Sequence, residues 1–184
     1  MKIIITGACG HIGSYLVENL FRIKKIKSVI LIDNLKANRF NSIFNLKNKP
    51  KVSFFQKDLT VKKSLNNFKK ADLLIHCASM TNAAGSFKNK KEMYFNNLEC
   101  MKNVLKFCKK TKTKLIHISS TSVYGKQSTI VSERDNHLLN PQSPYADIKL
   151  IEEKMLKKMD KKIKYISLRF GTITGISKGM RFHT

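Results

Sequence analysis

The sequence predicts an α/β fold built on a doubly wound parallel sheet, and three observations support this prediction. Six short apolar runs recur along the 184 residues, and helical patterns lie between them. The first run leads directly into a glycine-rich turn, Thr6-Gly7-Ala8-Cys9-Gly10-His11-Ile12-Gly13, which opens a helical stretch. Strands that alternate with helices are joined by right-handed crossovers, so the strands are expected to lie parallel in one sheet.

The apolar runs have the length and composition of strands that are buried on both faces. The expected strands cover about 2–6, 28–32, 52–56, 72–77, 114–119 and 164–169, and the expected helices lie near 12–24, 60–69, 90–110 and 143–159. Asn34–Lys51 is the least regular segment, with room for one short helix. Lys126–Pro144, with its two prolines, reads as a surface loop. Neither a repeat nor a linker interrupts the pattern, so one domain, 1–184, is expected.

The glycine turn indicates a phosphate site. Glycines spaced three apart let backbone N–H groups approach a pyrophosphate, whose charge is favoured at a helix N-terminus. Asp33 ends the second apolar run, about 20 residues after Gly13, where a carboxylate would bind ribose hydroxyls. Asp33 would also repel a 2′-phosphate, which favours NAD over NADP, although the nearby Lys36 and Arg39 weaken that preference. A chance glycine turn, with Asp33 acting only as a cap, is the alternative.

A second motif, Ser119-Ser120-Thr121-Ser122-Val123-Tyr124-Gly125, closes the fifth apolar run. Tyr145 and Lys149 follow four residues apart, so they share one face of the predicted helix. An ammonium group near a phenol favours the phenolate, which makes Tyr145 a candidate general base with Ser120 as its hydrogen-bonding helper. Tyr-x-x-x-Lys also arises by chance in a lysine-rich chain, and the hydroxyl groups could serve only local main-chain atoms.

These motifs, together with Asp33-Asn34, Asp58-Leu59 and His76-Cys77-Ala78, resemble the extended short-chain dehydrogenases/reductases, and most closely the NAD-dependent nucleotide-sugar epimerases and dehydratases. The resemblance implies a Rossmann-type domain in which Ser120, Tyr145 and Lys149 are catalytic. The residues implied to bind NAD are Gly7, Gly10, His11, Ile12, Gly13, Asp33, Asn34, Asp58, Leu59, Ala78, Ser79, Asn97, Tyr145 and Lys149. For Asp58 a capping role is the alternative, and for Asn97 a buried structural role.

The resemblance also implies a mechanism and a substrate, a nucleotide sugar. Tyr145 removes a proton from a sugar hydroxyl while hydride passes to NAD, Ser120 hydrogen-bonds the same oxygen, and Lys149 holds the nicotinamide ribose. Dehydratases of this family carry Asp-Glu directly after the catalytic hydroxyl, whereas this chain has Thr121-Ser122. Epimerisation or simple oxidoreduction is therefore preferred to dehydration. A homodimer through the helices that contain Leu98 and Tyr145 is the family's usual assembly.

The end of the sequence departs from the family pattern. Members usually continue well beyond this point and complete the sugar-nucleotide pocket there, whereas this sequence stops at Thr184. Residues 170–184 resemble the entrance to that missing part. We therefore expect a truncated product or an excerpt of a longer protein, and an inactive NAD-binding fragment is the alternative to an enzyme.

A formal charge of +24 raises the hypothesis of nucleic-acid binding. The lysines are spread over nearly every predicted helix, and few arginines accompany them. In Leu98–Lys110 the apolar residues follow a helical period with the lysines mostly elsewhere, as on a solvated face. Specific binding of nucleic acid is therefore not expected, whereas salt-sensitive attraction to polyanions is.

Other patterns limit the remaining classes of function. No apolar run approaches the roughly 18 residues that span a bilayer, and the first strand follows Met1-Lys2 without room for a signal peptide. The cysteines, Cys9, Cys77, Cys100 and Cys108, lack metal-type spacing and are expected to be reduced, buried thiols in a cytoplasm. His76 and His117 lie in strands and are expected to be core histidines. No membrane partner and no metal are predicted.

Overall fold

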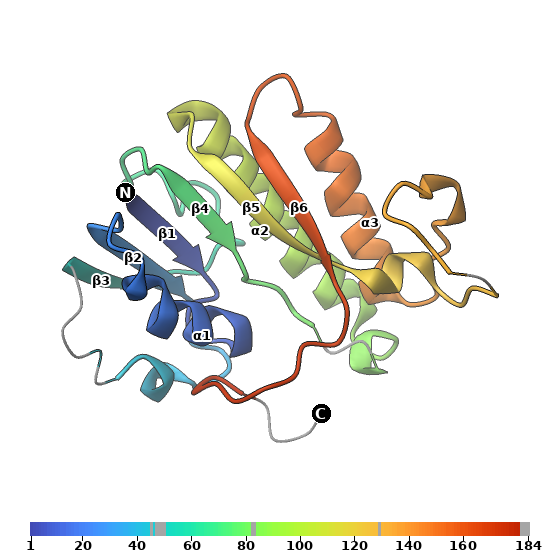
Figure 1. The fold of residues 1–184 in the computed structure, drawn as a ribbon, viewed down its shortest axis with the longest axis horizontal. Coiled ribbons are helices and arrows are strands. Elements are labelled where there is room, and N and C mark those ends of the chain that lie inside the picture. The colour runs from blue at the N-terminus through green and yellow to red at the C-terminus, as the bar shows by residue number, and fades with distance from the viewer. Residues whose placement is uncertain (45, 47–50, 82–83, 129, 181–184) are drawn as a thin grey trace.

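The computed structural model describes residues 1–44, 46, 51–81, 84–128 and 130–180. Within them, parallel strands form one six-stranded sheet with the order β3-β2-β1-β4-β5-β6 (Figure 1). The strands are β1 (Lys2–Thr6), β2 (Ser28–Asp33), β3 (Lys51–Gln56), β4 (Leu73–His76), β5 (Lys114–Ser120) and β6 (Tyr165–Phe170). The α-helices of the described residues are α1 (His11–Asn19), α2 (Lys90–Thr111) and α3 (Pro144–Lys157). The predicted doubly wound fold is confirmed.

The strand order reverses at β1, which pairs with β2 on one side and with β4 on the other. Ile4 sits at the centre of this arrangement, opposite Ile30 of β2 and Leu74 of β4. In a sheet of this kind, ligands bind at the carboxyl ends of the strands beside such a reversal. The glycine turn follows β1 directly, so the chain places it at that position.

Helices cover both faces of the sheet: α1 lies on one face, and α2 and α3 lie on the other (Figure 1). Successive side chains of a strand point to opposite faces, and β1 supplies both cores. Ile3 and Ile5 pack with Val17 of α1, whereas Ile4 packs with Met101 of α2. This two-sided burial is the reason that β1 is an uninterrupted apolar run.

The start of α3 is fixed by local sequence. Ser143 is the N-cap, and its Oγ accepts a hydrogen bond from the N–H of Ala146 at 3.2 Å. Pro144 occupies the first helical position, where its missing N–H costs nothing. The cap places Tyr145 in the first turn of the helix, directly after the predicted surface loop.

The helix predicted for 60–69 is wrong, because this segment is a series of turns. The main chain breaks at Lys63, which has a left-handed conformation with φ of 64°. A helix starting at 60 would also need the carbonyl of Val61 for its own hydrogen bonds. Instead, the Asn103 amide of α2 donates to the carbonyl oxygens of Leu59 at 2.8 Å and Val61 at 3.3 Å.

Short 3₁₀ helices occupy several of the connections. They are η1 (Leu20–Arg22), η2 (Phe40–Ile43), η3 (Ala84–Ser86), η4 (Thr121–Tyr124) and η5 (Asn136–Leu138). The short helix expected within Asn34–Lys51 is therefore η2, and residues 45 and 47–50 of that segment lie outside the described residues. The loop expected over Lys126–Pro144 is confirmed in its described part, which includes η5; residue 129 lies outside it.

Candidate active site

The glycine turn brings β1, β4 and α1 into close contact. Gly7 has φ of 66°, and a Cβ built there would lie 2.6 Å from the backbone nitrogen of Ala78. A Cβ built on Gly13 would lie 2.1 Å from the carbonyl oxygen of Gly7. These two glycines are required for the packing of the backbone itself.

Gly10 has a different environment, since a Cβ there would meet only the Gly7 carbonyl oxygen, at 3.3 Å. Gly10 is also the N-cap of α1 and contributes no side-chain cap to the helix. The first N–H groups of a helix lack partners within the helix and attract anions. The turn at Gly10 therefore has the backbone geometry for a pyrophosphate group, and Gly179 packs beside its carbonyl.

Asp33 lies beside this turn at the end of β2. Its Oδ2 accepts a hydrogen bond from the Cys9 N–H at 3.0 Å, and its Oδ1 accepts one from the Leu35 N–H at 2.9 Å. A carboxylate has about four acceptor positions, so Asp33 retains capacity for ribose hydroxyls. Lys36 pairs with Asp58 at 3.1 Å, and Arg39 donates to the Gly179 carbonyl at 3.0 Å. Both cations thus have other partners, which fits NAD better than NADP.

Other residues predicted to bind the cofactor have clear local partners. His11 Nδ1 lies 2.7 Å from the Ser177 hydroxyl, and Asn34 Oδ1 accepts from the Lys36 N–H at 3.1 Å. Ile12 is partly buried in the first turn of α1. The side chain of Leu59 lies in the core beneath α2, 4% exposed.

Asp58 has the capping contacts that were the alternative to NAD binding. Its Oδ1 accepts hydrogen bonds from the N–H of Thr60 at 2.9 Å and from the Thr60 hydroxyl at 2.7 Å. Partial burial opposes ionisation, but the Thr60 hydrogen bonds and the Lys36 ammonium hold the pKa of Asp58 below its ordinary value. Asp58 is therefore an ionised cap at the end of β3.

Ala78 and Ser79 follow β4, as predicted, and Asn97 of α2 fixes the segment that contains them. The Asn97 side chain is fully buried; its Oδ1 accepts from the Met80 N–H at 2.8 Å, and its Nδ2 donates to the Met80 carbonyl at 3.0 Å. The Ala78 N–H reaches the Thr6 hydroxyl at 3.5 Å. Asn97 thus has the structural role that was its alternative.

The hydroxyl groups after β5 differ in their hydrogen bonds. Ser119 donates to Glu153 Oε1 at 2.5 Å, and Thr121 donates to a main-chain carbonyl at 3.4 Å. The Ser122 hydroxyl donates to Ser120 Oγ at 2.9 Å, and the Ser122 N–H reaches the same atom at 3.2 Å. In these contacts Ser120 is the acceptor, so its own proton remains to be donated. This favours Ser120 as the helper hydroxyl, in agreement with the resemblance.

Tyr145 and Lys149 lie together on α3, as their spacing predicted. The Lys149 ammonium is 5.8 Å from the centre of the Tyr145 ring. Lys149 is buried, at 3% exposure, whereas Tyr145 is only partly buried. The pair therefore combines an accessible phenol with an ammonium group that is held inside the protein.

Glu153, four residues after Lys149 on α3, belongs to a network that the sequence motifs do not indicate. Arg169 of β6 donates to both oxygens of Glu153 on α3, at 3.0 and 2.7 Å, and also to the Tyr124 hydroxyl at 2.5 Å. Partial burial opposes ionisation of Glu153, but its bonds with Arg169 and Ser119 hold its pKa below the ordinary value. No spacing in the sequence indicates these contacts, because the partners of Glu153, Arg169 and Ser119, lie on β6 and β5 and become neighbours only in the fold.

The segment after β6 packs across the glycine turn (Figure 1). The Gly179 N–H donates to the Ser14 hydroxyl of α1 at 2.9 Å. A Cβ on Gly179 would lie 2.4 Å from the carbonyl oxygen of Cys9. Residues 177–180 therefore run along the carboxyl edge of the sheet, beside the proposed cofactor site; residues 181–184 lie outside the described part.

The prediction that His76 and His117 are core histidines is confirmed, since both are buried. Burial lowers the pKa of His76 to about 3. The unfolded chain takes up a proton at this residue below about pH 6.5, whereas the folded chain does not, so stability falls as the pH falls.

Acidification should therefore reduce the stability of the protein before its carboxylates titrate. Between pH 6 and 5, we expect His76 to contribute a loss of about 1 kcal/mol per pH unit in the free energy of unfolding. In urea titrations, His76→Gln should reduce the slope of the free energy of unfolding against pH by that amount. This holds whether or not the substitution changes the stability at pH 7. The exposed His137→Gln is the control. An unchanged slope in His76→Gln would contradict the assignment.

The cysteines are free thiols, and burial raises the pKa of Cys9, Cys77, Cys100 and Cys108 to about 12. They are therefore protonated and unreactive, as expected. Among the described residues no group of histidine, cysteine or acidic side chains could hold a metal ion. The helices found in the same residues are too short or too polar to cross a bilayer.

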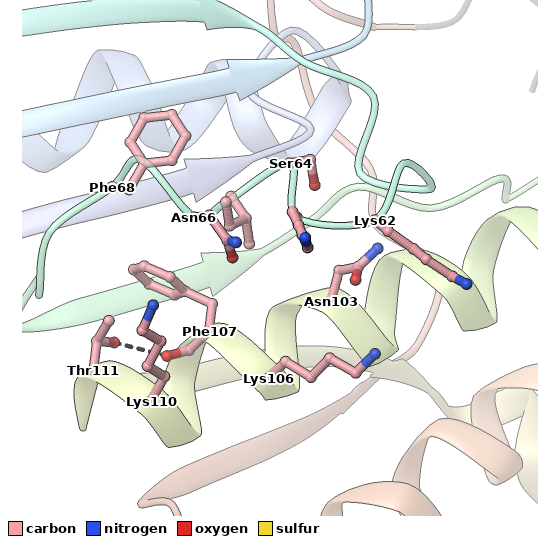
Figure 2. A pocket seen from close by; sticks show the side chains of 11 residues that line it. Lys62, Ser64, Asn66, Phe68, Asn103, Lys106, Phe107, Lys110 and Thr111 are labelled. Atoms are coloured by element: carbon pink, nitrogen blue, oxygen red, sulfur yellow. Dashed lines mark hydrogen bonds between the residues drawn. The ribbon is translucent and has the colours of Figure 1, made fainter.

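A separate cavity of about 230 Å³ lies between the turns at 62–68 and the second half of α2 (Figure 2). Phe68 and Phe107 contribute apolar surface, and Lys62, Lys106 and Lys110 lie around it. Its lining contains no carboxylate, histidine or thiol. The candidate catalytic groups therefore lie at the carboxyl edge of the sheet and not in this cavity.

Comparisons with known proteins identify the family of the chain. The profile of the NAD dependent epimerase/dehydratase family matches residues 3–184. An uncharacterized UDP-glucose epimerase of Bacillus subtilis is 31% identical over 193 residues, covering 100% of this chain and 60% of the relative. A dTDP-D-glucose 4,6-dehydratase of Dictyostelium discoideum is 29% identical over 180 residues, covering 89% of this chain and 41% of that protein.

Solved structures give the same result. The structure of a UDP-glucuronic acid 4-epimerase from Bacillus cereus, in complex with UDP-glucuronic acid and NAD, has a TM-score of 0.77 at 32% identity. The alignment covers 92% of this chain and 56% of that one. The chain belongs to the NAD-dependent epimerase/dehydratase family, which confirms the resemblance in the sequence. It spans about half the length of the curated relatives it matches.

Proposed function

We propose that residues 1–184 form the NAD-binding domain of a nucleotide-sugar epimerase, with 170–184 as the start of its substrate-binding part. The observation that supports the proposal is that two sets of candidate residues lie at the carboxyl edge of the same sheet. Gly10 and Asp33 offer a cofactor site, and Ser120, Tyr145 and Lys149 offer groups for proton transfer. The relatives that are named for UDP-sugars support a UDP-sugar as the substrate.

In the proposed reaction Tyr145 removes the proton from a sugar hydroxyl as a general base. Ser120 donates its free proton to the same oxygen and steadies it through the change. Lys149 supplies a buried positive charge beside Tyr145 and binds the ribose of the cofactor. NAD, when bound, supplies a hydride acceptor at the carbon that carries this hydroxyl. Gly7 and Gly13 keep the turn close to the sheet, and Gly10 places no side chain between the turn and the pyrophosphate.

Epimerisation is preferred to dehydration because of the two residues that follow Ser120. Loss of a 6-hydroxyl needs an acid near it, whereas this chain has Thr121 and Ser122. Both of these hydroxyl groups donate to other atoms, to a main-chain carbonyl and to Ser120. The preference rests on these residues, since dehydratases as well as epimerases occur among the relatives.

A second candidate function is NAD binding without turnover. In that case the described residues would hold the cofactor but convert no substrate. A homodimer through the outer faces of α2 and α3 also stays a prediction. Phe95 on α2 is 62% exposed and would be buried there.

Thermal unfolding with and without cofactor tests the proposal. At a concentration about 100 times its dissociation constant, NAD should increase the free energy of unfolding by roughly 2.7 kcal/mol. In a chain of this size that increase raises Tm by about 5–10 °C. NADP should give a much smaller shift because of Asp33. Measuring at raised ionic strength removes non-specific attraction to this basic chain.

Equal shifts with both cofactors, or none with either, would contradict the assigned site. Turnover of UDP-galactose to UDP-glucose, followed by a coupled assay, then separates the two candidates. Binding with turnover supports the epimerase, and binding without turnover supports the second candidate.

A further inference from the structure

A chain of buried polar groups lies behind the Tyr145–Lys149 pair. The Lys149 ammonium is 2.8 Å from Glu152 Oε2, and His117 Nε2 is also 2.8 Å from that oxygen. The side chains are 4%, 1% and 0% exposed for Lys149, Glu152 and His117. One carboxylate oxygen thus joins the lysine of the proposed site to a strand in the core.

The partners of these groups define their charges. His117 Nδ1 lies 2.9 Å from the Ser167 hydroxyl, which can donate to it and leave the proton of a neutral imidazole on Nε2, facing Glu152. Burial lowers the pKa of His117, which keeps the ring neutral. Burial opposes ionisation of Glu152, but the Lys149 charge and the His117 hydrogen bond bring its pKa to about 2. The set is therefore one ammonium, one carboxylate and one neutral ring.

The titratable groups around Lys149 and Glu152 come from each neighbouring element. His76 and Cys77 face them from the end of β4, Cys100 from α2, and Tyr145 from the first turn of α3. His76 and the two thiols are neutral near pH 7, since His76 resists protonation and the thiols resist ionisation.

The neighbouring acid on the same helix, Glu153, is paired with Arg169 instead. Glu152 is therefore the counter-ion of Lys149 among the described contacts. Burial by itself would lower the pKa of Lys149, but the Glu152 carboxylate outweighs it, so the pKa is raised.

We propose that Glu152 is a positioning residue that keeps Lys149 charged and fixed in the cofactor site, and that His117 holds Glu152 in place. The consequence for the site rests on the function proposed above, whereas the ion pair itself does not. A buried ammonium that loses its counter-ion gives up its proton. An ammonium has three donor positions, so the bond with Glu152 leaves two for other partners.

The first test is the stability of the chain without cofactor, measured by urea unfolding between pH 6 and 10. Glu152→Gln keeps the shape but removes the charge, so Lys149 should lose its proton in the folded state. The unfolded chain keeps that proton up to about pH 10.4, so the unfolding constant of Glu152→Gln, divided by that of the wild type at the same pH, should fall up to about tenfold per pH unit as pH rises. This ratio cancels the titration of the histidines and thiols, which is common to all variants. The same ratio for Glu152→Gln/Lys149→Met should not change with pH.

The double variant should also regain most of the stability that Glu152→Gln loses at pH 7. Glu92→Gln, at an exposed position of α2, controls for loss of a helix carboxylate. The same pH dependence in all variants, without rescue by Lys149→Met, would overturn the proposal. If Glu152→Gln does not fold but the double variant does, the proposal is supported. If neither variant folds, the proposal is overturned.

The second test is the dissociation constant of NAD, measured calorimetrically at pH 7 and 9. Glu152→Gln should increase the dissociation constant of NAD by about tenfold or more at pH 7, and further at pH 9, because a neutral Lys149 binds the ribose less well. His117→Leu should weaken it too, whereas His117→Gln, which retains an N–H donor, should preserve it. Unchanged affinity in Glu152→Gln would overturn the positioning role. A wild type that binds no NAD would instead refute the proposed function, and the stability test would still decide on the ion pair.

Discussion

Tyr145→Phe is expected to lower turnover of a UDP-sugar by about 10²–10⁴-fold, the usual contribution of a general base. The substitution removes only the phenol oxygen and keeps the ring, which lies 5.8 Å from the Lys149 ammonium. The pyrophosphate and ribose sites at Gly10 and Asp33 are not altered. Tyr145 is itself among the residues implied to bind NAD, so we expect NAD still to raise Tm, by somewhat less than in the wild type.

The measurement is kcat by the coupled assay, together with thermal unfolding in the presence of NAD. Tyr15→Phe is the matched control, because Tyr15 is 53% exposed on α1 and should tolerate the change without effect. A variant that keeps wild-type turnover would refute Tyr145 as the base. An equal loss of NAD binding and turnover would make its role structural.

Gly13→Val is expected to have the largest effect on stability. A Cβ at this position would lie 2.1 Å from the Gly7 carbonyl oxygen and 2.9 Å from the Ala8 Cα. Both are backbone atoms, so no side-chain rotation can relieve the contact, and α1 would have to move away from β1. We expect the free energy of unfolding to fall by about 3 kcal/mol or more, which lowers Tm by about 6–12 °C or prevents folding.

Urea unfolding followed by circular dichroism measures this effect. Gly171→Ala is the matched control, since a Cβ there has only the Thr121 hydroxyl near it, at 4.0 Å. The free energy of unfolding of Gly171→Ala should stay within about 1 kcal/mol of the wild-type value. A stable Gly13→Val chain would mean that the packing of the glycine turn is looser than the structure describes.

The strands could be predicted because their signal is local. Ile3, Ile4 and Ile5 are consecutive since both faces of the sheet are covered, and an apolar run reports this directly. The segment 60–69 could not be predicted in the same way. Its main-chain carbonyls bind Asn103, which is some 40 residues further along the chain, and no local pattern records that contact.

In the candidate site too, some contacts follow from local spacing and others from residues that are distant in the sequence. Tyr145 and Lys149 are four residues apart on one helix, so their proximity follows from helix geometry. The contacts of Glu152 with His117 and of Glu153 with Arg169 join α3 to β5 and β6. The sequence presents two adjacent glutamates and does not reveal that they face different partners.

The sequence by itself determined the parallel α/β fold, the glycine turn and the residues proposed for proton transfer, because periodicity and short spacings are properties of neighbouring residues. Only the tertiary structure decided that Asp58 and Asn97 hold the main chain, and that Lys149 has a buried counter-ion. These roles depend on which strands lie beside one another in the sheet. Burial then sets the charge of each group, because removal of water makes an unpaired charge unfavourable and a paired one stable.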